Sequence, residues 1–144
     1  MIIGVDFDGT IVEDKYPEIG RERPFATDTL RMLIAERHQI ILWTVREGKE
    51  LDEAVQWCRE RGVEFYAVNR DFPEENTNKN RHYSRKIKAD VWIDDRNVGG
   101  LPDWGTIYRI ITEKKTYEDV MREAIVGGLH DHQPPRKKHW WSRG

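Results

Sequence analysis

Short apolar runs alternate with longer stretches of helical spacing along this chain. Each run is rich in β-branched or aromatic residues, which is typical of buried strands. The runs are MIIGV, QIILW, EFYAV, DVWI and TIYRII, beginning at residues 1, 39, 64, 90 and 106. Between them, residues 25–37, 47–61 and 116–126 are expected to form helices. The repetition of strand and helix predicts an α/β fold with a mainly parallel sheet.

The stretch over residues 47–61 has one apolar face. Leu51, Ala54, Val55 and Cys58 recur at the i, i+3, i+4, i+7 spacing of an amphipathic helix. Cys58, the only cysteine, is therefore predicted to be a small core residue, and Gly62 to follow the end of the helix. A single cysteine excludes an internal disulfide and a cysteine-rich zinc site.

Composition narrows the class of protein further. A length of 144 residues suits about one domain, so an active site must lie within it or at a subunit interface. The formal net charge of −2 gives no general preference for nucleic acid. No apolar stretch approaches the roughly 20 residues of a membrane span, and the N-terminus lacks signal-peptide features. We therefore expect a cytoplasmic protein with no membrane partner.

Polar residues follow four of the apolar runs. The first run ends at Asp6, the second at Thr44, the third at Asn69, and the fourth at Asp94 and Asp95. In an open parallel sheet these positions share the carboxyl edge, where ligands bind. Asn69 alone is better explained as the polar residue at which a strand leaves the core. Asp6, Asp8, Thr44 and Asp94 together predict a site.

Clustered carboxylates repel one another unless a cation lies among them, and an oxygen-only set favours Mg2+. An EF-hand beginning at Asp6 is excluded, because Ile11 and Pro17 occupy its sixth and twelfth positions, where Gly and Glu are required. A simple turn at Asp8, Gly9 and Thr10 explains the glycine but not two acids beside an apolar strand.

Four segments of this chain resemble the motifs of the haloacid dehalogenase superfamily of phosphohydrolases. They are DFDGT, the Thr of LWT, a lysine in SRKIKAD, and IDD, and they occur in that family's order between Met1 and Asn97. The resemblance implies an α/β, three-layer, Rossmann-like fold with a mainly parallel central sheet and no separate cap domain. We expect this hydrolase domain to cover residues 1–126 and a polar, basic tail to cover residues 127–144.

The resemblance also implies the roles of the first motif. Asp6 is the expected nucleophile, which forms an aspartyl-phosphate and binds Mg2+. Asp8 is the expected general acid and base, and its backbone carbonyl is an expected metal ligand. Asp8 and Gly9 are also expected to contact the phosphate. The second aspartate favours phosphoryl transfer over dehalogenation.

The remaining motifs complete the expected site. Thr44 is expected to donate its hydroxyl to a phosphate oxygen, with capping of the following helix as the alternative. Lys86 is expected to offset the charge of nucleophile and phosphate; Lys88 is the alternative, since Ile87 stands where family members often have proline. Asp94 is expected to bind the metal, with Asp95 as a further ligand or a partner through water. Arg46 is expected to be exposed.

Substrate choice is less defined by the sequence. Residues 11–24, here called the flap, and the longer polar segment 69–85 are both too small for a cap. An open cleft suits a large phosphorylated substrate, such as a protein or a nucleic-acid end, or a small one enclosed by another subunit of a homo-oligomer. Basic residues of the longer segment either attract phosphates or form a solvated loop; they are Arg70, Lys79, Arg81 and Arg85.

The tail differs in composition from the rest of the chain. Gly127 and Gly128 are expected to end the last helix, and Pro134 and Pro135 to prevent another. Basic residues beside Trp140 and Trp141 are compatible with nucleic-acid contact, although docking on the chain's own domain or disorder is the commoner arrangement.

We therefore expect a Mg2+-dependent phosphatase that acts through an aspartyl-phosphate. Two alternatives stay open: a catalytically weak phosphate-binding or regulatory module, and a phosphatase of nucleic-acid ends.

Overall fold

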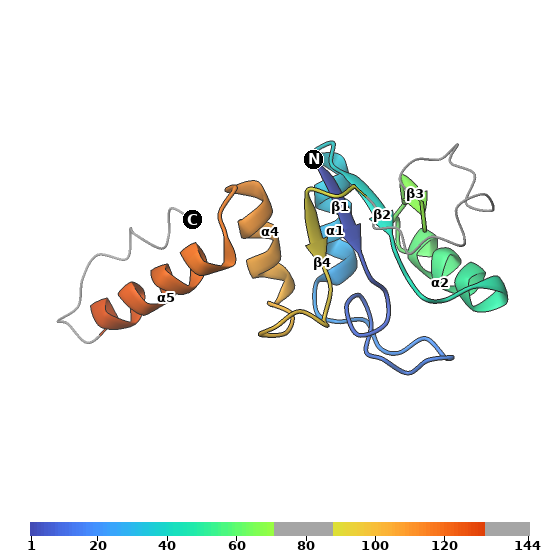
Figure 1. The fold of residues 1–144 in the computed structure, drawn as a ribbon, viewed down its shortest axis with the longest axis horizontal. Helices are drawn as coiled ribbons and strands as arrows, with labels where there is room; N and C mark the ends of the chain where they lie inside the picture. Colours follow the sequence, from blue (N-terminus) through green and yellow to red (C-terminus); the bar gives the residue numbers. More distant parts are fainter. Residues whose placement is uncertain (71–87, 132–144) are drawn as a thin grey trace. The chain divides into compact units, whose positions relative to one another are not determined.

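The structure, a computed structural model, describes residues 1–70 and 88–131 (Figure 1). Parallel strands and helices alternate along the chain, as the apolar runs predicted. The elements in chain order are β1 (Ile2–Val5), α1 (Ala26–Ala35), β2 (Gln39–Leu42), α2 (Gly48–Glu60), β3 (Ala67–Val68), β4 (Val91–Ile93), α4 (Trp104–Thr112) and α5 (Tyr117–Asp131).

The described strands form one parallel sheet in the order β3-β2-β1-β4 (Figure 1). In register, Ile3 lies between Ile40 of β2 and Val91 of β4. The chain moves outward from β1 through β2 to β3 and then returns to the other side of β1 for β4. Ligands bind at such a reversal of strand order, beyond the carboxyl ends of the strands. This topology places the ends of β1 and β4 beside one another.

Alternating strand residues build the core on both faces of the sheet. Ile3 and Val5 pair in register with Ile40 and Leu42, and all four are buried. On the other face, buried Ile41 and Ala67 pack with partly buried neighbours, which are Ile2, Trp43 and Ala89. The apolar composition of these short runs follows from burial on both faces.

Helices α1 and α2 lie where the hydrophobic spacing predicted them. Ala54 and Cys58 are buried on α2, which confirms Cys58 as a core residue. Burial raises the pKa of its thiol to about 12, so Cys58 is an unreactive apolar side chain. Gly62 has a φ of +82° just past the end of α2, which is the conformation expected of a glycine after a helix.

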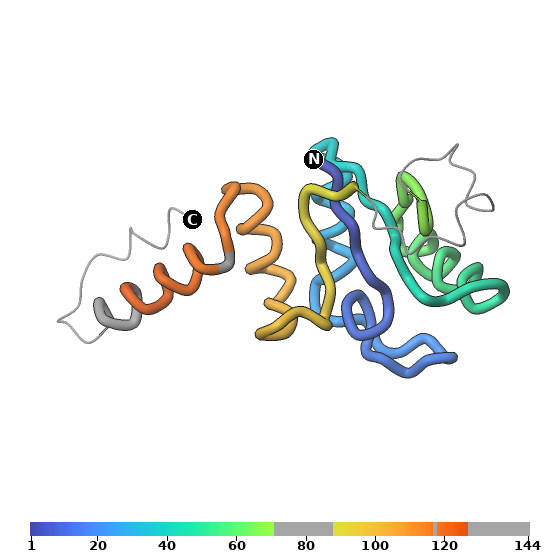
Figure 2. Tube along the Cα trace, in the orientation of Figure 1, coloured from blue at the N-terminus to red at the C-terminus, as the bar shows by residue number. Residues whose placement is uncertain are grey.

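The flap is a short excursion that returns on itself (Figure 2). Val12 pairs with Glu22 in antiparallel fashion, the Glu13 N–H donates to the Arg21 carbonyl at 2.8 Å, and the Arg23 N–H donates to the Ile11 carbonyl at 2.8 Å. No cap domain is inserted within residues 1–70 and 88–131, in agreement with the short flap that the sequence predicted. Residues 71–87, which include most of the second polar segment, lie outside the described residues.

The run TIYRII was predicted to be a strand, and this prediction was wrong. It lies within α4, because Trp104, Ile107 and Ile111 occupy one helical face and are all buried. Asp103 caps this helix by accepting the Thr106 N–H at 2.9 Å, and that hydrogen bond lowers the pKa of Asp103. A six-residue apolar run does not distinguish the two elements by itself.

The last helix is also longer than predicted. Helix α5 continues through Gly127 and Gly128 to Asp131, because glycine weakens a helix by about 1 kcal/mol per residue but does not force it to end. Residues 132–144 of the expected tail, with their prolines and tryptophans, lie outside the described residues.

The chain divides into two compact units, Met1–Tyr108 and Arg109–Gly144. Within the second, Arg109 donates to Glu113 at 2.9 Å and to Glu123 at 3.0 Å, and Lys115 pairs with the same two acids. None of the helices in the described part of the chain is both long enough and apolar enough to cross a membrane.

Candidate active site

Three carboxylates converge at the carboxyl ends of β1 and β4. Asp6 follows β1, and its N–H donates to the Ile93 carbonyl of β4 at 3.1 Å. Asp94 and Asp95 follow β4, and one oxygen from each of the three side chains lies within 4.8 Å of the others. The parallel pairing of β1 with β4 therefore brings residues about 90 positions apart in sequence, 6 and 94, into one cluster.

The electrostatics of this cluster favour the binding of a cation. Burial first, and then the charges of Asp94, Asp95 and Asp8, raise the pKa of Asp6 to about 7, although a hydrogen bond from the Phe7 backbone amide lowers it. The donor set consists of carboxylate oxygens only, which is the chemistry that Mg2+ prefers. Oxygen donors at this spacing, with an unfavourable charge balance, fit a divalent cation.

A tight turn after Phe7 sets the backbone of this site. The Phe7 carbonyl accepts the N–H groups of Thr10 at 3.2 Å and Ile11 at 2.9 Å, and Gly9 has a φ of +84°. A β-carbon on Gly9 would lie 2.3 Å from Oδ2 of Asp95. Gly9 is thus required both for its left-handed conformation and for the approach of the Asp95 carboxylate.

Thr10 joins this turn to β4, a role that the sequence reasoning did not assign. Its hydroxyl donates to Oδ1 of Asp95 at 3.2 Å and accepts the Asp95 N–H at 3.1 Å, while its carbonyl accepts the Trp104 indole N–H at 3.1 Å. Thr10 is fully buried. The sequence feature that could have indicated this role is the position of Thr10 directly after Asp6, Asp8 and Gly9.

Replacing Gly9 by Ala is expected to destabilise the protein by about 3 kcal/mol, at the upper end of common substitution effects. The strain of a left-handed alanine adds to the clash with Asp95. Denaturant unfolding of G9A and of G48A measures the two contributions separately, because Gly48 has a φ of +57° and open space around it. G48A should lose only roughly 1 to 2 kcal/mol. Equal losses in the two variants would show that Asp95 does not constrain Gly9.

Asp8 lies on the same loop but outside the three-carboxylate cluster. Its oxygens accept hydrogen bonds from Arg46, Nε to Oδ2 and Nη2 to Oδ1, both at 2.7 Å. Arg46 was expected to be exposed, and this expectation was wrong, because its side chain turns inward and is fully buried. The neighbouring Val45 is 90% exposed instead. Composition does not reveal such burial, because a charged side chain enters a core only where tertiary partners satisfy it.

Thr44 and Asn69 lie together at the ends of β2 and β3. The Thr44 N–H donates to Oδ1 of Asn69 at 2.8 Å, and the Thr44 hydroxyl oxygen accepts the Arg46 N–H at 3.1 Å. Asn69, which has a φ of +53°, therefore holds the loop after β2 through this hydrogen bond. It is not merely a polar residue at the end of a buried strand. Helix α2 has Glu47 at its N-cap and no side-chain cap hydrogen bond, so Thr44 does not cap it.

Comparison with known proteins assigns the fold and the family. A conserved protein from Bacteroides thetaiotaomicron is 62% identical over 83% of this chain and 96% of its own length, with a TM-score of 0.76. A D,D-heptose 1,7-bisphosphate phosphatase from B. bronchiseptica, solved with magnesium and phosphate, shares the fold at 12% identity and a TM-score of 0.51, over 78% of this chain and 98% of its own.

The chain belongs to the family of this Bacteroides protein, and it shares the fold of the B. bronchiseptica phosphatase. No protein-family model and no curated protein matches the chain. The shared fold agrees with the parallel sheet of this chain, whose strands are followed by Asp6, Thr44 and Asp94.

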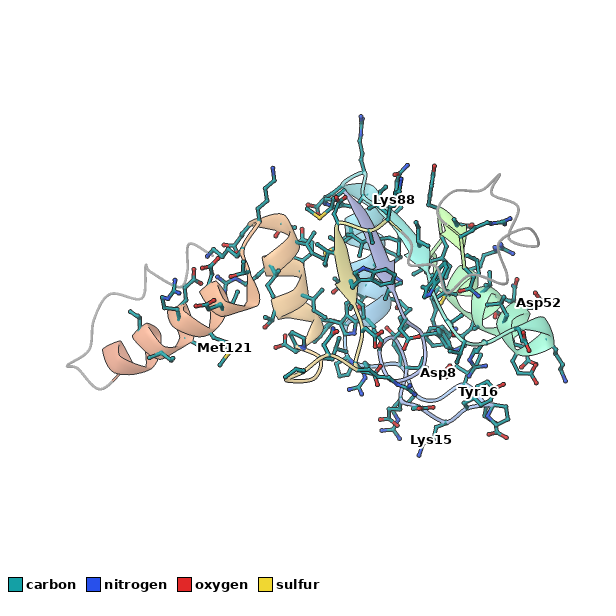
Figure 3. All side chains as sticks on the ribbon, viewed as in Figure 1. Asp8, Lys15, Tyr16, Asp52, Lys88 and Met121 are labelled. Atoms are coloured by element: carbon teal, nitrogen blue, oxygen red, sulfur yellow. The ribbon has the colours of Figure 1, made fainter. Side chains whose placement is uncertain are left out.

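The lysine of the third superfamily motif stays a prediction. Lys86 lies outside the described residues. Lys88 is exposed and precedes β4, so it lies at the amino end of that strand, whereas Asp94 lies at its carboxyl end. Figure 3 shows Lys88 at the opposite end of the sheet from Asp8. Lys88 therefore does not join the carboxylate cluster.

Proposed function

We propose that this protein is a Mg2+-dependent phosphatase that cleaves phosphoric monoesters through an aspartyl-phosphate on Asp6. The observation that carries the proposal is the convergence of Asp6, Asp94 and Asp95 at the reversal of strand order. The magnesium and phosphate bound by the B. bronchiseptica phosphatase, which shares the fold, support it.

Asp6, Asp94 and the backbone carbonyl of Asp8 would hold the ion, with Asp95 beside them. When bound, Mg2+ would offset the charge of the carboxylates and of the phosphoryl oxygens. Such a charge balance permits a phosphate dianion to approach a carboxylate nucleophile.

The side chains of this chain then divide two chemical steps between them. An oxygen of Asp6 attacks phosphorus, the bond from phosphorus to the leaving oxygen breaks, and Asp8 gives its proton to that oxygen. In the second step Asp8 takes a proton from water, which attacks phosphorus and releases phosphate and the Asp6 carboxylate. The Thr44 hydroxyl and Lys86 would bind the phosphoryl oxygens.

Hydrolysis of p-nitrophenyl phosphate with and without Mg2+ tests the proposal, followed by a panel of phosphorylated metabolites, peptides and oligonucleotides. We expect Mg2+-dependent release of phosphate, with Asp6→Asn protein as the blank. Binding of phosphate without turnover on any substrate would instead identify a phosphate-binding or regulatory module.

The partners follow from the same proposal. A short flap and the absence of a cap in the described residues suit a large phosphorylated substrate, or a small one enclosed by a second copy of the chain. The nucleic-acid-end alternative stays a prediction, because Trp140 and Trp141, which motivated it, lie outside the described residues. The cytoplasmic location is likewise a prediction.

A further inference from the structure

Arg46 is the charged side chain most deeply placed in the described part of the chain, with 1% of its surface exposed. Nε and Nη2 of its guanidinium each donate to a different oxygen of Asp8, at 2.7 Å. A carboxylate offers about four lone-pair positions, so this fork occupies one on each oxygen and leaves one on each. The plane of the Asp8 carboxylate is therefore set by Arg46.

The remaining donors of Arg46 bind the flap and α2. Nη2 donates to the Glu18 carbonyl at 2.9 Å, and Nη1 donates to the Pro17 carbonyl at 3.1 Å and to the Glu50 carbonyl at 3.4 Å. The ring of Tyr16, also in the flap, lies 5.1 Å from the guanidinium carbon. Figure 3 shows Tyr16 and Asp8 at the same end of the sheet.

The backbone of Arg46 also reaches the second motif, since its N–H donates to the Thr44 hydroxyl oxygen at 3.1 Å. One residue thus contacts the proposed acid, the proposed phosphate-binding hydroxyl and the flap. Burying a guanidinium carries a large desolvation cost, which is offset only when every donor has a well-placed partner. Such a network holds its members in one arrangement and is sensitive to the loss of any one of them.

We propose that Arg46 is a positioning residue that orients the Asp8 carboxyl toward the leaving oxygen and ties that orientation to the flap. The inference rests on the proposed function, because it assumes that Asp8 protonates a leaving group. Arg46 does not itself contact the substrate. Its effect reaches the reaction through the two lone-pair positions that it leaves on Asp8.

Leaving-group dependence separates this role from a merely structural one. A p-nitrophenolate leaves without a proton, whereas an alkoxide needs one, so loss of general acid catalysis slows alkyl phosphates selectively. We expect R46K, which keeps the charge but loses the fork, to lower kcat/KM about 100-fold for an alkyl phosphate and less than about 3-fold for p-nitrophenyl phosphate. D8N should show the same selectivity.

A double-mutant cycle tests the link to Asp8 directly. In the D8N background, R46K should change kcat/KM for the alkyl phosphate by less than about 3-fold, because the carboxyl to be positioned is already gone. R59K is the matched control, since Arg59 is exposed and pairs with Glu64 at 3.6 Å, and it should leave both substrates unchanged. Equal losses on both substrates, or independent effects of R46K and D8N, would overturn the inference.

A second readout does not depend on activity. Amide hydrogen exchange at Glu13 and Arg23, whose N–H groups close the flap, should accelerate about 10-fold or more in R46K and not in R59K. If R46K does not fold, D8N gives the same test, because loss of the ion pair should loosen the flap. Unchanged exchange in the flap would contradict the coupling. A wild-type protein that hydrolyses neither phosphate would refute the proposed function. An active wild-type protein whose R46K variant loses activity equally on both substrates would refute only the positioning role of Arg46.

Discussion

Asp6→Asn protein is expected to lose phosphatase activity by about 10⁴-fold or more in kcat/KM, as enzymes do when a covalent nucleophile is removed. Asparagine keeps the size of the side chain but cannot form the aspartyl-phosphate. Steady-state hydrolysis of p-nitrophenyl phosphate with saturating Mg2+ measures the loss. Retention of full activity would exclude Asp6 as the nucleophile.

A matched control and a stability measurement make this result specific. Asp52 is an exposed carboxylate on α2 (Figure 3), and D52N should retain activity. Metal-free D6N should be more stable than the wild type at pH 8, because it removes one of the clustered charges. Loss of activity together with a higher Tm separates a chemical effect from unfolding.

Removal of Mg2+ is expected to lower activity to the background of the D6N protein. The carboxylates that would hold the ion repel one another without it, and the phosphoryl oxygens would meet uncompensated negative charge. Exhaustive treatment with EDTA followed by titration with Mg2+ measures the loss and its recovery. Rates that survive complete chelation would contradict a metal-dependent mechanism.

The pH dependence of stability provides a check without substrate. The folded-state pKa of Asp6 is raised to about 7, so the unfolded chain releases this proton at lower pH than the folded one. The metal-free protein should therefore lose stability as pH rises from about 4 to about 7, with no further loss from this group above that window. Mg2+ binds the ionised form, so the Tm increase that it causes should grow over the same window, and both trends should be much smaller in D6N. A Tm increase independent of pH would show that Asp6 does not bind the ion.

The fold class and the carboxylate cluster were predictable because both depend on local features. Short apolar runs with polar ends predict parallel strands whose carboxyl edges meet, and Asp6 and Asp94 lie together for that reason. The run TIYRII was wrongly predicted as a strand because the buried face of α4 consists of Trp104, Ile107 and Ile111, and the run begins only at residue 106. Without Trp104, its six residues do not show the helical spacing. The end of α5 was misplaced because glycine lowers helix stability without determining where a helix ends.

The pairing of Asp8 with Arg46 could not be predicted. The two residues are 38 positions apart, and the buried state of Arg46 depends on carbonyl groups of the flap and α2 that only the folded chain brings together. From the sequence, Arg46 is an arginine just after a strand, and arginine side chains are exposed in most proteins.

The sequence by itself therefore determined the alternating α/β order and the oxygen donors at the strand ends. These are consequences of periodicity and of side-chain chemistry, which each residue carries wherever it lies. The tertiary structure alone decided that the Asp8 side chain lies outside the carboxylate cluster, that Gly9 admits Asp95, and that Arg46 holds Asp8 to the flap. Those features depend on distances between residues far apart in sequence, which are set only when the sheet and its loops have packed.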